Sequence, residues 1–402
     1  MRILFCTDTY PPQVNGVSVV TALSVEGLRR RGWKVAVVAP RYPRGTYNPF
    51  AGPRPGAGLE DELTVIRSLA FPPYPDIRIA APAYPTIAGA IARFAPDVVH
   101  CETEFMIGRL GQVAARRAGI AMTTSYHTDF SRYTEAYGVP RLRSAVSSYI
   151  ARFHGRARRT FTPSEPARQD LLALGLRDVE VWGRGVDATV FSPARRSPAM
   201  REGFGIGDAF TFVHVGRLAA EKGVDTILDA FRIAREALPR DSIRLIIAGA
   251  GPAEQELRTR APQGVSFVGF LDRRDVLPPL YASADAFLFA SLTETLGLVI
   301  LEAMASGLPV IATPAGGVAD HLRHGVNGLA FPPRDAAAMA QAMVQVVLDR
   351  PLAIRLSAGA VSTARALSWD AELDRLDRSY REIAAEREPA AAAPVGALSA
   401  AG

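Results

Sequence analysis

The 402-residue chain contains only two cysteines, Cys6 and Cys101, which are too few for a framework of disulfide bonds. A reducing compartment fits this composition best. The chain has no apolar run of the roughly 18 residues that a membrane-spanning helix needs, and the residues after Met1 do not form a hydrophobic leader. We therefore expect a cytoplasmic protein. The 48% of hydrophobic and 21% of charged residues also exclude a largely disordered, collagen-like or coiled-coil protein.

Several metal- and nucleotide-binding motifs are absent as well. The sequence has no Asp-x-Asp pair, which leaves a metal-bound diphosphate without a carboxylate clamp. None of the six histidines has the spacing of a metal-ligand pair. The loop after the first predicted strand lacks the Gly-x-Gly-x-x-Gly pattern of dinucleotide-binding folds. We expect neither a metal ion nor a bound cofactor.

Lysine is nearly missing, because 44 of the 46 basic residues are arginines and only Lys34 and Lys222 remain. A lysine retained in such a composition suggests a need for a compact ammonium group on a flexible stem. The basic excess lies in residues 1–187, which contain 24 basic and 16 acidic residues; the rest contains 22 basic and 24 acidic ones. The first part of the chain is therefore the better candidate to meet an anionic partner.

Short β-rich runs alternate with helical patterns, which is typical of parallel sheets covered by helices. The first unit is predicted to have strands at 2–7, 35–39, 97–101 and 121–125. A second unit is predicted to have strands at 210–215, 243–249, 265–269, 286–290 and 309–313. We expect an α/β protein with two facing Rossmann-like domains, at 1–187 and 188–368, and a central crevice. A helix at 369–386 would pack back toward the first domain, and a tail at 387–402 would be disordered.

Ligands of open α/β sheets bind beyond the carboxyl ends of the strands, so the loops there are candidate sites. Gly16 ends the first such loop, where the amides of the following helix could face an anion. Arg217 and Lys222 bracket the loop after the strand at 210–215, where two cations could neutralise a phosphate leaving group. The simpler interpretations are a tight turn at Gly16 and two solvated surface charges.

Glu294 and Glu302 form a second pair of candidates after the strand at 286–290. They are eight residues apart, which is about 12 Å along a helix and similar to the length of a sugar joined through a diphosphate to a ribose. Glu294 would hold sugar hydroxyls, Glu302 the ribose diol, and the amides of residues 295–298 the diphosphate. A capping Glu294 and a paired or exposed Glu302 are the alternatives. The apolar sequence around Glu302, where an unpaired carboxylate is costly, favours a functional role.

His127 follows the predicted strand at 121–125 and would face the same crevice. There it could donate to a phosphate or to a transferring sugar. A structural histidine fits the position equally well. His214 lies within a predicted strand, and we expect it in the core.

Three features together resemble the GT-B glycosyltransferases of family 4. These are the Glu294/Glu302 spacing, the segment GRLAAEKG at 216–223 and the segment SGLPVIA at 306–312. This retaining family includes bacterial mannosyltransferases and synthases of sulfoquinovosyl and glucosyl lipids, and the resemblance covers about residues 1–385. It implies the GT-B fold, a sugar-nucleotide donor held mostly by the second domain and an acceptor held by the first. Retention in the family is described as a front-face displacement in which the leaving phosphate oxygen acts as the base.

The resemblance also implies roles for matching residues. Arg217 and Lys222 would neutralise the donor diphosphate, Glu294 would hold the transferring hexose, and His127 would lie near the reacting sugar, so these four are the expected catalytic residues. Glu302 would hold the ribose. The expected donor-binding residues are Gly16, Gly216, Gly249, Gly251, Phe270, Leu271, Thr295, Leu296, Gly297, Leu298 and Glu302.

The resemblance further implies a class of acceptor. The segments SYHT at 125–128 and WGRGVD at 182–187 resemble the branch that glycosylates lipids, so we expect a lipid or glycan acceptor and favour GDP-mannose over a UDP-sugar. Asp320 departs from the family, in which many members carry glutamate, and the shorter acid should alter reach only. Nucleic acid is not expected, because no binding motif is present.

The segment 141–159 mixes arginines with apolar residues at helical spacing. Such a helix could lie on an anionic membrane surface and hold the protein at the inner face of the membrane. An apolar core face with solvated arginines is the interpretation that the pattern favours slightly.

Three alternatives to this function stay open. Within the family, a UDP-sugar-dependent glucosyl- or sulfoquinovosyl-type lipid transferase has the same motifs. A nucleotide-sugar epimerase of the same shape would need an acid/base pair, which His127 and Glu294 could form. A non-catalytic nucleotide-sugar binding protein would share the crevice, although the joint presence of the charged candidates argues against it. A phosphorylase is disfavoured because neither lysine lies in a pyridoxal-binding context.

Overall fold

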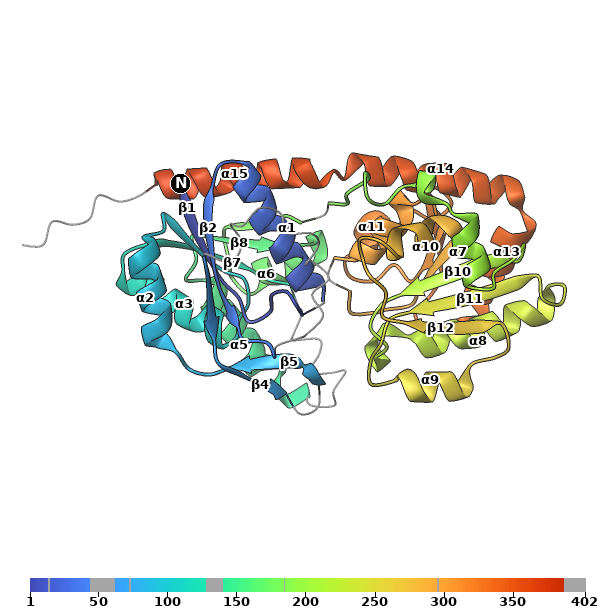
Figure 1. Cartoon of the computed structure of the whole chain (residues 1–402), viewed down its shortest axis with the longest axis horizontal. Helices are drawn as coiled ribbons and strands as arrows, with labels where there is room; N and C mark the ends of the chain where they lie inside the picture. Colours follow the sequence, from blue (N-terminus) through green and yellow to red (C-terminus); the bar gives the residue numbers. More distant parts are fainter. Residues whose placement is uncertain are drawn as a thin grey trace, which may run out of the picture.

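The computed structural model describes residues 1–13, 15–43, 62–71, 74–127, 140–183, 185–294 and 296–386. Two parallel sheets, each covered by helices, form two domains that lie side by side (Figure 1). The α/β class and the two Rossmann-like units predicted from the sequence are therefore confirmed.

The first domain contains a parallel sheet in the order β3-β2-β1-β6-β7-β8-β9. Its strands are β1 (Arg2–Cys6), β2 (Lys34–Pro40), β3 (Leu63–Ile66), β6 (Val98–Cys101), β7 (Ala121–Ser125), β8 (Arg159–Thr162) and β9 (Val179–Val181). A separate antiparallel hairpin consists of β4 (Ser68–Phe71) and β5 (Tyr74–Ala80). The helices are α1 (Gly16–Arg30), α2 (Tyr84–Phe94), α3 (Met106–Arg117), α5 (Arg143–His154) and α6 (Glu165–Ala173), with a 3-10 turn at Pro140–Leu142. The strands β3, β8 and β9 and the hairpin are not among those predicted from the sequence, because they are short or carry few apolar residues.

The second domain repeats the plan with a sheet in the order β12-β11-β10-β13-β14-β15. Its strands are β10 (Phe210–Val215), β11 (Ile243–Ala248), β12 (Val265–Gly269), β13 (Ala286–Phe289), β14 (Val310–Ala312) and β15 (Gly328–Ala330). Its helices are α7 (Pro198–Gly203), α8 (Val224–Ala237), α9 (Glu254–Arg260), α10 (Leu277–Ser283), α11 (Leu298–Ala305), α12 (Val318–His321), α13 (Ala336–Leu348) and α14 (Arg350–Ala366), with 3-10 turns at Pro193–Arg195 and Ala220–Lys222. All five strands predicted here are present, and β15 is an additional short one.

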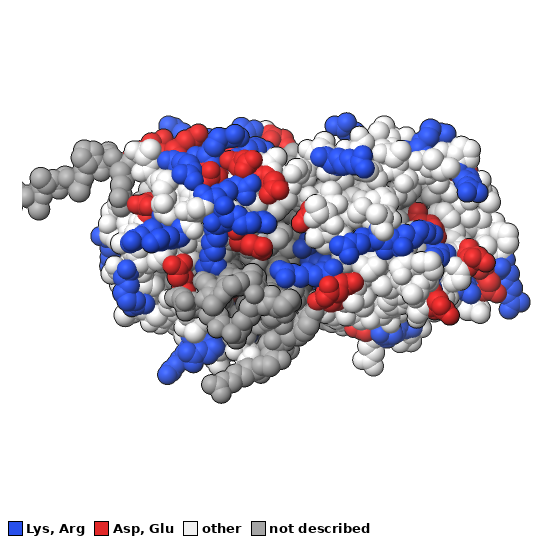
Figure 2. Space-filling view, turned by 45° about the horizontal axis from the view of Figure 1, so that its top comes forward, with Lys and Arg blue, Asp and Glu red and all other residues white. Residues whose placement is uncertain are grey.

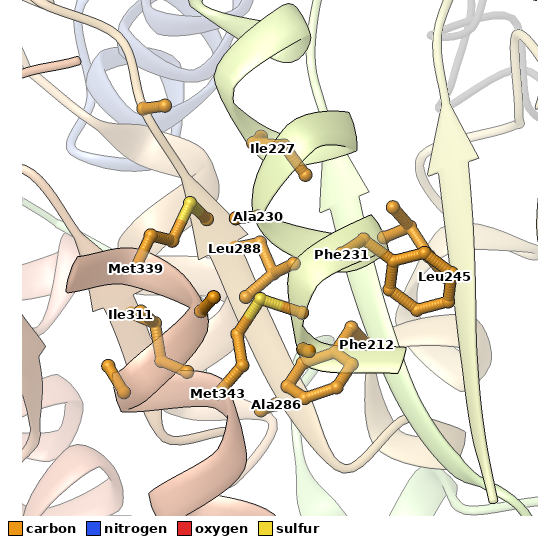
Figure 3. Close-up of a cluster of buried hydrophobic side chains, with 14 of the residues drawn as sticks. Phe212, Ile227, Ala230, Phe231, Leu245, Ala286, Leu288, Ile311, Met339 and Met343 are labelled. Carbon is orange, nitrogen blue, oxygen red and sulfur yellow. The ribbon is translucent and has the colours of Figure 1, made fainter. Parts of the chain in front are cut away.

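The core of the second domain shows how the sheet holds its loops. Ile227 and Phe231 lie one turn apart on α8 and are fully buried against the sheet, while Met339 and Met343 do the same from α13 (Figure 3). Burying a side chain of this size stabilises a fold by about 1.5–3 kcal/mol. A sheet packed in this way is a rigid support for the loops at its edge.

The last helix, α15 (Trp369–Ala385), leaves the second domain and packs along the first, beside α1 (Figure 1). Trp33 Nε1 donates to Asp377 Oδ1 at 2.5 Å, and Trp182 Nε1 donates to the Glu372 carbonyl at 2.8 Å. Figure 2 shows basic and acidic side chains intermingled on the side of the first domain where α15 lies. Arg31 of the first domain forms an ion pair with Asp374 of α15 at 2.7 Å. The predicted tail at 387–402 lies outside the described residues.

The segment 141–159 is shorter as a helix than predicted. The helix α5 ends at His154, and Arg159 already begins β8. Ile150 and Phe153 are buried in the domain core, whereas Leu142 is 54% exposed. Part of the apolar stripe is therefore core. Within the described ranges, none of the helices combines the length and the apolar composition that a membrane-spanning segment requires.

Candidate functional site

The sheet orders themselves point to two candidate positions. In each sheet the first strand lies between the second strand and a later one, β1 between β2 and β6 and β10 between β11 and β13. The loops on the two sides of such a reversal diverge and leave a crevice beyond the carboxyl ends of the strands. The loops that follow β1, β6, β10 and β13 are therefore the places to expect binding groups.

The loops after β10 and β13 bring Lys222 and Glu294 together, although they are 72 residues apart in sequence. Lys222 Nζ lies 2.8 Å from Glu294 Oε2, and the Gly297 amide donates to Glu294 Oε1 at 3.2 Å. The two side chains are 17% and 19% exposed. The site thus contains a charge-balanced carboxylate whose orientation is held from two sides. Both groups are still accessible to a ligand.

Arg217 lies in the loop after β10 and pairs with Glu221, four residues later, whose side chain is largely buried. The Arg217 side chain remains 39% exposed. An anion that approaches this loop would share the guanidinium with Glu221, a residue that the sequence analysis did not consider.

Two of the predicted glycines are explained by the packing of neighbouring loops. A Cβ at Gly249, whose φ is +138°, would lie 1.8 Å from the Gly216 carbonyl oxygen, so only glycine fits there. A Cβ at Gly251 would lie 2.2 Å from the Leu218 carbonyl oxygen. A Cβ at Gly16 would meet no atom within 4 Å. Internal packing therefore does not explain Gly16, in contrast to the other two.

The segment that enters α11 packs against the first domain. Leu296 is buried in the same apolar cluster as Phe161 and Trp182, and Leu298 is partly buried beside it. The Gly297 amide already donates to Glu294. These leucine side chains thus hold the loop in place, and Thr295 lies outside the described residues. In the neighbouring loop Phe270 is 47% exposed, while Leu271 packs against the core of the second domain.

The environment of Glu302 differs from the prediction. The helix α11 begins at Leu298, so the continuous helix from Glu294 that the estimate of about 12 Å assumed is not present. The Glu302 side chain is buried, but Arg273 Nε donates to it at 3.0 Å and the Tyr281 hydroxyl lies 3.5 Å from Oε2. Burial raises the pKa of Glu302, and Arg273 opposes that rise. The carboxylate is paired, so its apolar surroundings alone do not require a ligand, and its contact with ribose stays a prediction.

In the first domain, His127 is held by a carboxylate that the sequence analysis missed. His127 Nε2 lies 2.7 Å from Oε1 of Glu102, and His100 Nε2 lies 2.5 Å from its Oε2. Thr21 also donates to Oε1 at 3.1 Å. Burial would raise the pKa of Glu102, but the two imidazoles outweigh it and hold that pKa well below its ordinary value. Glu102 follows β6 directly, so the rule of strand ends would have found it.

This network reaches the last helix, because the Tyr380 hydroxyl of α15 lies 3.0 Å from His100 Nδ1. Asp8, at the end of β1, has a structural role instead: it accepts from the Thr103 hydroxyl at 2.7 Å and from the Ile107 amide at 2.9 Å, at the start of α3. Burial raises the pKa of Asp8. At the carboxyl ends of the first sheet, Glu102 therefore orients His127. Hydrogen bonds to Asp8 fix the neighbouring loop and the start of α3.

Two further residues named from the sequence have structural partners. His214 is fully buried, as expected, and burial lowers its pKa to about 4, so it is a neutral core histidine. Asp320 accepts from the Glu165 amide of the first domain at 3.0 Å, which ties the domains together. Among the residues that the structure describes, no three His, Cys, Asp or Glu side chains are arranged to hold a metal ion.

Comparisons with known proteins cover both domains. Residues 14–190 match the family described as Glycosyltransferase Family 4, and residues 209–349 match the family described as Glycosyl transferases group 1. A GDP-mannose-dependent alpha-mannosyltransferase of Mycolicibacterium smegmatis is 33% identical over 395 residues, which cover 98% of this chain and 100% of that protein. A sulfoquinovosyl transferase of Arabidopsis thaliana is 34% identical over 280 residues, or 67% of this chain and 53% of that protein.

Solved structures agree in fold. The HepE protein of Anabaena in complex with UDP-glucose superposes with a TM-score of 0.72 at 21% identity, over 95% of this chain and 99% of that one. Sucrose-phosphate synthase of Thermosynechococcus elongatus gives a TM-score of 0.76 at 21% identity, over 96% and 99% of the two chains. At such identities the likeness shows the fold alone. It is the GT-B arrangement of two facing Rossmann-like domains that the sequence predicted.

Proposed function

The chain belongs to glycosyltransferase family 4 and acts on a sugar nucleotide, and from this premise we propose that it is a retaining α-mannosyltransferase. Its donor would be GDP-mannose, its acceptor a lipid or a glycan, and no metal ion would take part. The identity of 33% to a GDP-mannose-dependent enzyme over nearly the whole length of both proteins supports the donor. The similarity to a sulfoquinovosyl transferase supports a lipid acceptor.

The observation that carries this proposal is the contact of Lys222 with Glu294 at the strand-order reversal of the second domain. Glycosyl transfer needs groups that hold the sugar in one orientation and a cation that stabilises the charge growing on the leaving diphosphate. A carboxylate accepts hydrogen bonds from sugar hydroxyls. If Glu294 holds the sugar, the ammonium group of Lys222, 2.8 Å from that carboxylate, would stand beside the bond that breaks. Arg217 would share the neutralisation of the diphosphate.

The first domain would complete the site with His127. The ionised Glu102 accepts from His127 Nε2 and so sets which ring nitrogen carries that hydrogen. With that hydrogen turned toward Glu102, the Nδ1 of a neutral His127 would accept a hydrogen bond from a hydroxyl of the reacting sugar, and it would donate to the sugar or its phosphate only as the imidazolium. In a front-face displacement the leaving phosphate oxygen takes the proton of the acceptor hydroxyl, so no carboxylate nucleophile is needed.

The test is a panel of GDP-mannose and UDP-sugars incubated with the purified protein and a membrane-lipid extract, followed by mass spectrometry. Transfer of one hexose from GDP-mannose supports the proposal, and NMR of the product reports retention through its anomeric configuration. Transfer from a UDP-sugar alone would move the assignment to the UDP-dependent lipid transferases. Conversion of a donor to its epimer without transfer would overturn the proposal.

Variants sharpen this test. Lys222→Ala and Glu294→Ala should each remove turnover, because the first removes the cation proposed to stabilise the leaving diphosphate and the second removes the carboxylate proposed to hold the sugar. The matched control is Glu254→Ala, which breaks the exposed pair of Glu254 with Arg258 on α9 and should leave turnover unchanged. Normal turnover in either crevice variant would remove that residue from the mechanism.

A further inference from the structure

A second concentration of positive charge lies in the first domain, between α3 and the turn that follows α5. A cavity of about 370 Å³ is lined by Arg109, Arg116 and Arg117 of α3 and by Arg156 of the turn. We call these four residues and their cavity the arginine pocket. Its volume is at the lower end of the range of small-molecule sites, about 300–1,000 Å³.

The arginine pocket is separate from the crevice. The helix α3 follows β6 and runs back along the sheet, so its last turn, with Arg116, lies toward the amino ends of the strands. Met122, which also lines the pocket, is the second residue of β7. Figure 1 shows α3 beside α2, on the side of the first domain turned away from the second domain. A ligand here would therefore not be the sugar nucleotide of the crevice.

The charges of the pocket are not balanced by nearby acids. No carboxylate lines the cavity. Among the ion pairs between described residues, none includes Arg109, Arg116 or Arg156, and Arg117 lies over the ring of Tyr84 at 5.0 Å. Burial and the repulsion from Arg109 and Arg116 lower the pKa of Arg156. Four cations that line one cavity in this way would be stabilised by a bound anion.

The wall of the pocket also contains a polar atom without a partner. Gln112 is buried, and its Nε2 donates to the Phe153 carbonyl at 2.9 Å, which fixes the orientation of the amide. Its Oε1 accepts no hydrogen bond from any described residue. A ligand hydroxyl that reached this buried oxygen would satisfy it, which favours a ligand that brings a hydroxyl group along with its negative charge.

We propose that the arginine pocket binds the phosphate group of a phosphorylated polyol of the glycerol phosphate class. Planar guanidinium groups match the oxygens of a phosphate in geometry as well as in charge. The phosphorylated polyol can be a free metabolite or part of the headgroup of an anionic phospholipid. If it is a headgroup, binding in the arginine pocket would hold the first domain against a membrane surface. The site goes beyond the proposed function and does not depend on which sugar is transferred.

The test measures binding of sn-glycerol 3-phosphate by calorimetry and of vesicles made of phosphatidylcholine with phosphatidylglycerol by flotation. The pocket variant is Arg116→Ser/Arg156→Ser. The matched control is Arg350→Ser/Arg355→Ser, which also removes two positive charges, but from exposed positions on α14. Lys222→Ala reports any binding in the crevice. The pocket variant should melt no lower than the wild type, because it loses only like charges.

We expect the pocket variant to bind at least about tenfold more weakly, since it loses charge-assisted hydrogen bonds, while the control and Lys222→Ala bind as the wild type does. This result with glycerol phosphate identifies a free ligand, and with vesicles alone it identifies a lipid headgroup. An equal loss in the control would show a net-charge effect and overturn the proposal. Loss in Lys222→Ala alone would place the binding in the crevice, and no binding to either probe would likewise refute the site.

Discussion

Replacing Glu102 by glutamine tests how the first domain orients His127, the histidine that we propose to contact the reacting sugar. The carboxylate accepts from His127 at 2.7 Å and from His100 at 2.5 Å, and it is buried. Glutamine has nearly the same shape, but one of its two terminal atoms is a donor, so it can accept from only one of the two imidazoles. The variant therefore loses at least one hydrogen bond to a charged group, which is worth about 1.5–3 kcal/mol.

The free energy of the lost hydrogen bond sets the expected decrease in kcat. A factor of ten in rate corresponds to about 1.4 kcal/mol, so Glu102→Gln should lower kcat by about 10- to 100-fold. The donor KM should stay unchanged, because Lys222 and Glu294 lie in the other domain. The assay is initial-rate kinetics with the sugar nucleotide identified by the panel. NMR of the imidazole nitrogens should show a hydrogen on His127 Nε2 in the wild type and a changed tautomer in the variant.

The decisive comparison uses His127→Ala as a background. If Glu102 acts through His127, adding Glu102→Gln to His127→Ala should cause no further loss of kcat. A full additional loss in the double variant would refute the reasoning and give Glu102 a separate role. The NMR measurement needs no turnover, so it decides the pairing even if the proposed donor is wrong.

The pH dependence follows from the same pair. The pKa of Glu102 is lower in the folded protein than in the unfolded chain, where it is about 4.3. The ionised carboxylate therefore stabilises the fold above about pH 4.3, and this contribution is lost as the pH falls through the lowered pKa. Denaturant titrations should show a shallower loss of stability below that pH for Glu102→Gln. An identical slope would contradict the lowered pKa.

The remaining predictions concern backbone fit and charge balance. Gly249→Ala should destabilise the protein by about 1–3 kcal/mol in urea titrations, since its Cβ would lie 1.8 Å from the Gly216 carbonyl oxygen. Gly16→Ala meets no protein atom and should leave stability intact while raising the donor KM, and an unchanged KM would remove Gly16 from the donor site. Arg273→Met removes the charge partner of the buried Glu302 and should lower the free energy of unfolding by about 3–5 kcal/mol. Adding Glu302→Gln should restore most of that stability, and a failure to do so would mean that the ion pair is not what Arg273 provides.

The sequence was sufficient wherever the determining pattern is local. Runs of β-branched and apolar residues predicted the strands of the second domain. The predicted strand ends placed Lys222 and Glu294 in two separate loops. The rule that ligands lie beyond strand ends then predicted that such loops face one crevice. The strands β8 and β9 escaped because RTFT and VEV lack such a run.

The tertiary structure decided which charges meet. Arg273 is 29 residues from Glu302, and Tyr380 is 280 residues from His100, so no sequence spacing indicates either contact. The same holds for the arginine pocket, in which α3 and the turn after α5 converge. Local sequence determines which backbone conformation a segment prefers. The partner of a buried charge depends on which segments the core brings together, because burial removes the water that would otherwise solvate it.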